Sequence, residues 1–230
     1  MTLAVTRSEV PAGLVALPVR TAIVRPGDDL PALVAKWVAG IASRGDVIAV
    51  SETAVAIAQG EFVIAEHIRP SKLAYALSRR AGALATVNQP ESLQLVIDAV
   101  GPWKVFYAAV MHVVGRLRGH RGAFYEVLGE AITAIDGYTG TMPPYERAIV
   151  LAPREPDAFS EDVFAKTGAG CVVVDANDLE KAKVLGASSG LNRSMVENAL
   201  LDNPHGNGDE QTPIVVLKWR NAGENPLWAV

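Results

Sequence analysis

The sequence predicts an α/β fold of the mixed α+β kind, in which helices flank one or more sheets. Short apolar runs, typical of buried strands, alternate along the chain with segments whose apolar residues recur at helical spacing. Three of the runs also end in acidic or hydroxyl side chains, as strands do at the ligand-binding edge of an α/β sheet. These runs are Val47–Val50, Ile132–Ile135 and Val172–Val174.

The first half of the chain begins with an expected entry strand over Leu14–Val24. Asp28 or Asp29 can cap the helix that follows, and Pro31 suits its first turn. Aromatic and β-branched residues dominate Lys104–Leu117 and favour a strand there. The other expected elements are a strand at Glu61–Ala65 and helices from Pro70 to about Arg80 and from Gln89 to about Val100.

The second half is expected to hold strands at Ala131–Ile135, Arg147–Leu151, Cys171–Val174 and Ile214–Leu217. The segment Pro153–Asp157 is expected to turn into a helix through about Thr167. Asn177 or Asp178 is a potential cap for a helix over Leu179–Leu185. A further helix is expected to run to about Leu201. No internal repeat interrupts this order, so one domain over residues 1–230 is predicted, with a possible subdivision near 101–130.

Composition excludes several classes of protein. The net charge of −4 gives no electrostatic footprint for nucleic acid, and no basic helix predicts a membrane surface. The single cysteine, Cys171, excludes a disulfide scaffold and favours a reducing compartment. The first residues lack the pattern of a signal peptide, so a cytoplasmic location is expected.

Acidic side chains at the strand ends are the first candidates for chemistry. Asp136 and Asp175 each follow an apolar run, and Glu52 and Thr53 follow another. Two converging carboxylates suit Mg²⁺ or Mn²⁺, which prefer oxygen ligands and often bind with substrate phosphates. For Asp175 the alternative is a strand that simply leads into the cap of the next helix.

A polar loop over Asn203–Thr212 is the second candidate, because its glycines allow backbone N–H groups to approach a phosphate closely. It is not a Walker P-loop, since no Gly-Lys-Ser/Thr follows a strand here. A solvated connection is the alternative. The four histidines have no metal-ligand spacing.

Several segments, in this order, resemble the γ-glutamyl ligases that add glutamate to the deazaflavin coenzyme F-420. The resemblance covers most of the chain. Its pieces are Leu17–Arg20 with Arg25–Leu30, Gly45–Thr53 with Ala58–Gly60, Pro70-Ser71, Ala134–Asp136, Val150–Pro153 with Asp157, Val173–Asp175, and the loop from Gly206 before Pro213–Val216.

The resemblance implies a mixed α/β fold, an intertwined homodimer and an amide-forming reaction. The family uses GTP and two divalent metals to activate a carboxylate as an acyl phosphate, which the amine of L-glutamate attacks. GTP (or ATP) and Mg²⁺ or Mn²⁺ are therefore expected, with a small acid and an amino acid as substrates. By this resemblance Asp136 and Asp175 are the catalytic residues, and both bind metal together with Glu210. The nucleotide-site residues implied are Leu17, Pro18, Val19, Arg20, Glu52, Thr53, Thr139, Gly206, Asn207, Gly208, Asp209, Glu210 and Gln211.

The chain also departs from the family's pattern. Ile57 stands where the family has a nucleotide-contacting lysine, and Ala176 and Asn207 replace a threonine and a glutamate. The segment between Asp175 and the glycine loop is shorter than in the family. These departures give the alternative function, a catalytically silent relative that binds a nucleotide or metabolite and acts through partners. A phosphotransferase or hydrolase with the same metal site is a third possibility.

Overall fold

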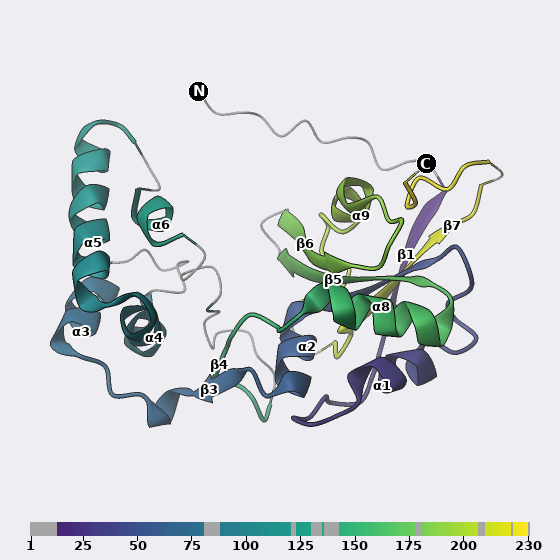
Figure 1. Ribbon diagram of the computed structural model, residues 1–230, viewed down its shortest axis with the longest axis horizontal. Coiled ribbons are helices and arrows are strands. Elements are labelled where there is room, and N and C mark those ends of the chain that lie inside the picture. The colour runs from purple at the N-terminus through teal and green to yellow at the C-terminus, as the bar shows by residue number, and fades with distance from the viewer. Residues whose placement is uncertain are drawn as a thin grey trace. The chain divides into compact units, whose positions relative to one another are not determined.

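The computed structural model describes residues 13–80, 88–120, 123–129, 135, 143–177, 181–206, 210–221 and 223–229. The chain divides into two compact units, drawn in Figure 1. The sheet unit comprises Met1–Gly60 and Pro153–Val230, and the helical unit is Glu61–Ala152, inserted between these two segments.

The sheet unit is built on five strands in the order β1-β7-β2-β5-β6. Neighbouring strands are antiparallel except β2 and β5, which are parallel. The strands are β1 (Leu14–Val19), β2 (Val47–Ser51), β5 (Gly170–Asn177), β6 (Lys181–Ala187) and β7 (Ile214–Trp219). A mixed sheet with flanking helices confirms the predicted fold class.

Both faces of this sheet are covered, which explains why its strands are nearly continuous apolar runs. In Figure 1, α9 (Arg193–Ala199) lies on one face, and α1 (Leu30–Trp37), α2 (Glu52–Gln59) and α8 (Pro156–Thr167) lie on the other. The α9 face buries alternate strand residues, among them Val172 and Val174 of β5. The intervening side chains therefore point toward α2 and α8.

Local sequence signals position the helices. The Asp29 side chain accepts a hydrogen bond from the backbone N–H of Ala32, which caps α1, and Pro31 lies in its first turn. The Asn192 side chain caps α9 in the same way, through the N–H of Met195. A short polar side chain at this position stabilises the N–H groups that have no partner within the helix.

The helix predicted over Leu179–Leu185 is wrong, because Lys181–Ala187 forms β6. Asn177 is the last residue of β5, where it pairs with Lys181. Val184 is buried between more exposed neighbours, as in a strand. Antiparallel pairing with β5 satisfies the backbone of both segments, which a short helix of mixed polarity could not do. Asp178, the other expected cap, lies outside the described residues.

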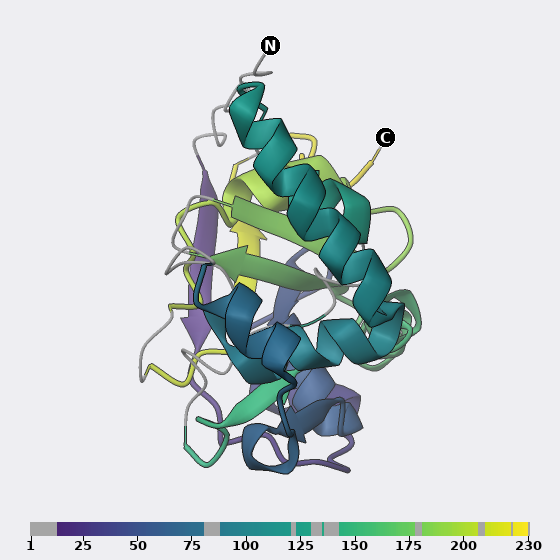
Figure 2. The same ribbon diagram turned by 90° about the vertical axis from the view of Figure 1, so that its left-hand side faces the viewer.

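The helical unit packs a small sheet and a group of helices around its own core. Its strands are β3 (Phe62–Ile64) and β4 (Ala148–Val150), paired antiparallel. A 3-10 turn, η1 (Ala65–His67), follows β3. Its helices are α3 (Lys72–Ser78), α4 (Pro90–Val100), α5 (Pro102–Leu117) and α6 (Ala123–Leu128). Figure 2 turns these helices toward the viewer. Leu93, Ile97 and Val105 lie in this unit's core.

The strand predicted over Lys104–Leu117 is also wrong, since this segment is α5. Pro102 occupies its first turn, where a missing N–H costs nothing. Val105, Ala108 and Gly115 are buried at helical spacing, so packing against α4 and α6 decides the conformation. Strand propensity is a weak preference that tertiary contacts override.

Of the strand predicted at Ala131–Ile135, the described part is Ile135, which forms a bridge with Leu151. The sequence predicts one domain, and the structure divides into two compact units; that these units form one domain stays a prediction. Among the described helices, none is long and apolar enough to span a membrane singly; α4 and α5 pass that test only as a pair bent by 115°.

Candidate functional site

One end of the five-stranded sheet gathers half of the candidate residues that the structure describes. The strands β1, β2 and β5 run in one direction, and β6 and β7 run in the other. The ends of the first three strands and the beginnings of the other two therefore share an edge. Ligands bind at such an edge in open α/β sheets. The edge carries Arg20, Glu52, Thr53, Asp175, Lys183 and Gln211.

Backbone hydrogen bonds hold the edge together. The N–H of Thr21, just after β1, donates to the carbonyl oxygen of Gln211 (3.0 Å). The N–H of Ser51, at the end of β2, donates to the carbonyl oxygen of Pro213 (2.8 Å). The segment before β7 is thus bound to the ends of both neighbouring strands. Because β7 lies between β1 and β2, it brings the predicted nucleotide segments and the end of the glycine loop to one place.

The predicted residues Leu17, Pro18 and Val19 lie within β1 itself, paired with β7. Pro18 is tolerated because β1 is an edge strand of the sheet. Val19 is buried, whereas Arg20 is exposed immediately beyond the strand. Pro18 and Arg20 are thus the exposed members of this set, and Arg20 is the one that carries a charge for a ligand at this edge.

Asp175 lies on β5 directly beyond the level at which β2 ends, since Ser51 pairs with Val174. Its carboxyl group is half-buried, and this burial raises its pKa above the ordinary value of 3.8. A carboxylate desolvated in this way is stabilised by a nearby cation. By the alternation along β5, it points to the face that carries α2 and α8.

Lys183 is a residue that the sequence reasoning missed. It is the cross-strand partner of Asp175 on β6, so both side chains lie on the same face of the sheet. Its positive charge partly opposes the rise in the pKa of Asp175. The ammonium group is exposed, and the described residues include no ion pair to it. The signal for Lys183 lies in strand register, which could not be read while this segment was expected to be a helix.

His205 is a second residue that was missed, at the start of the glycine loop. Its Nδ1 lies 3.2 Å from the carbonyl oxygen of Thr212, whose hydroxyl donates to the carbonyl oxygen of His205 (2.5 Å). These two contacts close the loop between them. Burial lowers the pKa of His205 to about 4, so the ring is neutral at pH 7. Its buried Nε2 has no hydrogen-bond partner within the described part of the chain.

Glu210 folds back onto the beginning of the same loop. A Cβ atom placed on Gly206 would lie 2.7 Å from the carboxyl carbon of Glu210, so a larger residue there would displace the flexible end of the Glu210 side chain. Gly206 also has a φ of +72°, which glycine adopts without strain. The Glu210 carboxylate therefore lies close to Gly206, at the beginning of the loop.

An open groove of ≈ 730 Å³ lies on the helical face of the same unit, a feature that no sequence pattern indicated. It is bounded by the beginnings of α1 and α8 and the end of α2. Gln59 and Arg154 connect its two sides: the Arg154 N–H donates to Gln59 Oε1 (2.7 Å), and Gln59 Nε2 donates to the Arg154 carbonyl oxygen (2.9 Å). The groove lining includes Asp28, Glu155 and Phe159.

The remaining predicted residues fall outside the described part of the chain. They are Asp136, Thr139, Asn207, Gly208 and Asp209. Within the described residues, no three side chains of the His, Cys, Asp or Glu types come together as a metal-binding group. The predicted metal set of Asp136, Asp175 and Glu210 therefore stays a prediction.

Comparison with known proteins adds a family to this geometry. A family model described as F420-0:Gamma-glutamyl ligase matches residues 18–174. The chain is also similar to the Coenzyme F420:L-glutamate ligase of Methanopyrus kandleri, with 41% identity over 140 residues. That alignment covers 61% of this chain and 48% of the relative, so the chain spans about half the length of the curated protein that it matches.

Proposed function

The chain belongs to the F420-0:gamma-glutamyl ligase family, and from that premise we propose that it is a ligase that forms an amide bond of the γ-glutamyl type. Its substrates are an amino acid such as L-glutamate and a small carboxylic acid. The observation that carries the proposal is the sheet edge, which Asp175, the N-terminal end of α2 and the segment before β7 share. Such an edge offers a carboxylate and backbone groups to a nucleotide.

The proposed reaction passes through an acyl phosphate, formed by phosphoryl transfer from GTP or ATP to the acceptor carboxylate. Catalysis of phosphoryl transfer consists mainly of positioning and of stabilising negative charge. Mg²⁺ or Mn²⁺ would supply the positive charge that stabilises it. The donors available here are hard oxygen ligands, Asp175 and Glu210, and the half-buried Asp175 carboxylate is a group that a cation would stabilise. Asp136 is the further ligand that the sequence predicts.

The chain's own residues have separate roles in this proposal. Arg20 and Lys183 provide exposed positive charge for phosphate groups at the edge. Glu52 and Thr53 begin α2, where backbone N–H groups favour anions. The contacts between His205 and Thr212 hold the two ends of the glycine loop together. A homodimer is part of the same proposal.

Ligand-dependent unfolding is the first test, because a ligand of the native state raises the unfolding midpoint by mass action. We expect GTP or ATP with Mg²⁺ or Mn²⁺ to raise it, and L-glutamate with an acceptor acid to release phosphate. Asp175→Asn should lower turnover by at least about 100-fold, as loss of one charge-stabilising group commonly does. Asp98→Asn, on α4 in the helical unit, is the matched control. A folded wild type whose unfolding midpoint does not change with any pair of nucleotide and metal would exclude the proposed ligase function.

One observation favours the alternative function. Ile57, which replaces a nucleotide-contacting lysine of the family, is 6% exposed and packs inside α2 as part of the core. No side chain at this position reaches a ligand without local rearrangement. If nucleotide raises the unfolding midpoint but no acceptor supports phosphate release, a silent nucleotide-binding relative is the better description.

A further inference from the structure

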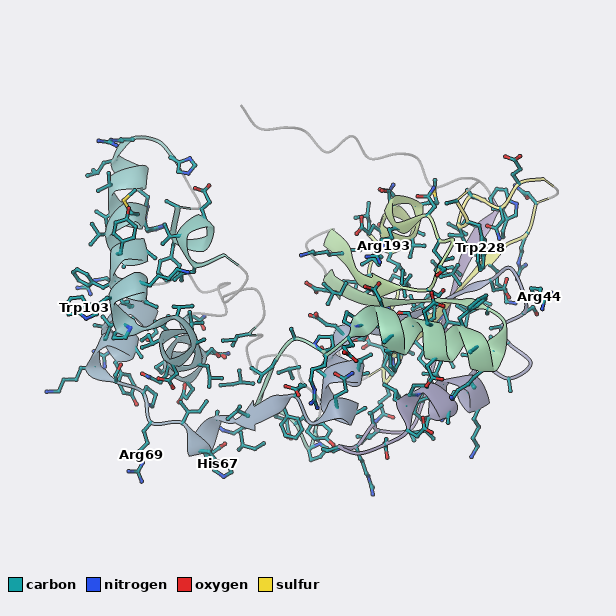
Figure 3. The ribbon with its side chains drawn as sticks, in the orientation of Figure 1. Arg44, His67, Arg69, Trp103, Arg193 and Trp228 are labelled. Atoms are coloured by element: carbon teal, nitrogen blue, oxygen red, sulfur yellow. The ribbon has the colours of Figure 1, made fainter. Side chains whose placement is uncertain are left out.

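The helix α5 presents apolar side chains on two opposite sides. Val105, Ala108 and Gly115 face the core of the helical unit, against α4 and α6. The outer side is apolar as well, and Figure 3 shows Trp103 pointing away from α4 and α6. In Figure 2 the same side faces the viewer, and no other described element of its unit lies in front of it. We call this outer set the α5 stripe: Trp103, Phe106, Tyr107, Val110, Val113 and Leu117.

The α5 stripe is too large to be incidental. Trp103 is 82% exposed and Leu117 is 84% exposed, and the other members range from 43% to 59%. Since one aromatic side chain can bury about 150–250 Å², the six residues offer on the order of 700 Å² of apolar surface. That area exceeds the largest patch of most monomers, about 300–600 Å². It approaches the roughly 800 Å² per partner of a standard interface.

We propose that the α5 stripe is the surface through which two copies of this chain associate, with their α5 helices packed antiparallel. The proposal rests on the homodimer named under the proposed function and identifies its contact surface. Five members of the stripe, at positions 103, 106, 110, 113 and 117, alternate steps of three and four residues. This is the spacing by which two helices interlock side chains at a shallow angle. A lipid surface requires no such repeat.

The distribution of side-chain size selects the antiparallel arrangement. The aromatic residues Trp103, Phe106 and Tyr107 occupy the first half of the stripe, and the aliphatic residues Val113 and Leu117 occupy the second half. With a two-fold axis at Val110, Trp103 of one copy lies opposite Leu117 of the other, and Tyr107 lies opposite Val113. Large side chains then meet small ones along the whole contact, which keeps the distance between the helices constant. Parallel packing would place aromatic residues on aromatic residues.

Charge separates this proposal from membrane docking. No Asp or Glu occurs between residues 99 and 120, while Lys104, Arg116 and Arg118 flank the α5 stripe. In the antiparallel pair Lys104 approaches Arg116 and Arg118 of the second copy, so like charges repel at the rim. Added salt should therefore strengthen the dimer, because it screens this repulsion. Binding to an anionic bilayer should instead weaken with salt.

The first experiment measures the mass of the full chain by sedimentation equilibrium. We expect a dimer for the wild type and a monomer for the double variant Trp103→Glu, Leu117→Glu. Ile23→Glu is the matched control, because Ile23 is an exposed apolar residue of the sheet unit (45%) outside the α5 stripe. This control should remain dimeric. A double variant that is still dimeric, with an unchanged dissociation constant, would overturn the proposal.

The second experiment tests the arrangement. Lys104→Glu should lower the dissociation constant several-fold at low salt, because it places opposite charges at both ends of the antiparallel contact. Flotation with vesicles of phosphatidylcholine and phosphatidylserine tests whether the α5 stripe binds a lipid surface instead of a second copy. A monomeric wild type that floats with these vesicles would replace the second copy by a lipid surface, and one that does not float would show that the stripe is covered within the chain. Nucleotide-dependent stability, measured on the same samples, reports separately on the ligase.

Discussion

At the scale of single residues, Asp175 joins a cost in stability to a proposed role in binding. Burial raises its pKa in the folded chain above the ordinary value of 3.8, so folding favours the protonated form. The contribution of this group to stability is complete below pH 3.8 and is lost as the pH rises through the raised value. At neutral pH the charged carboxylate destabilises the metal-free protein.

Asp175→Asn should therefore raise the unfolding midpoint of the metal-free protein at pH 7 by a few degrees. The gain should shrink as the pH falls toward the ordinary range of a carboxyl group. The same variant should lose any stabilisation by Mg²⁺ or Mn²⁺. Thermal unfolding at several pH values, with and without metal, checks both expectations. A variant less stable than the wild type at every pH would contradict the assigned electrostatics.

His205 predicts the opposite dependence on pH. Its pKa falls from 6.5 to about 4 on folding, so the stability that it contributes is complete above pH 6.5 and is lost as the pH falls through 4. The loss amounts to roughly 3 kcal/mol at the acid end. His205→Asn should unfold with a weaker dependence on pH between 6.5 and 4. Denaturant titrations of both proteins across that range measure the difference, and parallel curves would exclude His205 as its source.

At the scale of elements, α8 packs closely against β6 on the face of the sheet to which Asp175 points. A Cβ atom on Gly186 would lie 2.3 Å from the backbone carbonyl carbon of Pro156. Asp157 reinforces the contact, because its carboxylate accepts from the Ala187 N–H (2.9 Å) and from Arg193 (2.6 Å). The beginning of α8 is thereby held against β6, the strand that pairs with β5.

Gly186→Ala should destabilise the sheet unit by about 1–3 kcal/mol, as overpacking against backbone does. Gly170→Ala should cost less, because the atom that its Cβ would meet at 2.8 Å is the end of the flexible Leu191 side chain. Chemical denaturation of the two variants tests this order. Equal stabilities would show that α8 can shift away from β6 without cost.

Element type was predictable where local signals and packing agree. The cap at Asp29 and the proline at position 31 place the start of α1 correctly. For α5 and β6 the signals disagree. The β-branched and aromatic residues of α5 favour a strand, and Lys181–Ala187 has too few apolar residues to show its period. In both cases the contacts with α4 and α6, or with β5, decide the conformation.

At the scale of the whole molecule, the helical unit is an insertion whose two ends are adjacent. Gln59 and Arg154 exchange hydrogen bonds directly, including one from the Arg154 guanidinium to the Gln59 carbonyl oxygen (3.0 Å). Removing Glu61–Ala152 and joining Gly60 to Pro153 through a short glycine linker should leave the sheet unit folded.

Circular dichroism and cooperative thermal unfolding of the shortened chain check this expectation. Gln59→Ala in the same background is the control, because it removes two of the hydrogen bonds that bring the ends together. A shortened chain without a cooperative transition would mean that the sheet unit depends on the insertion for its stability.

The sequence alone determined the fold class and the family resemblance, because these depend on local patterns: apolar runs, their polar ends and ordered motifs. From the same patterns it predicted a metal-binding role for Asp175. Only the tertiary structure decided that Asp175 faces Lys183, that His205 closes the glycine loop and that α5 exposes an apolar stripe. Each of these depends on register or on packing between segments distant in sequence. The physical reason is that a side chain's neighbours across a sheet or a helix interface leave no trace in its local pattern.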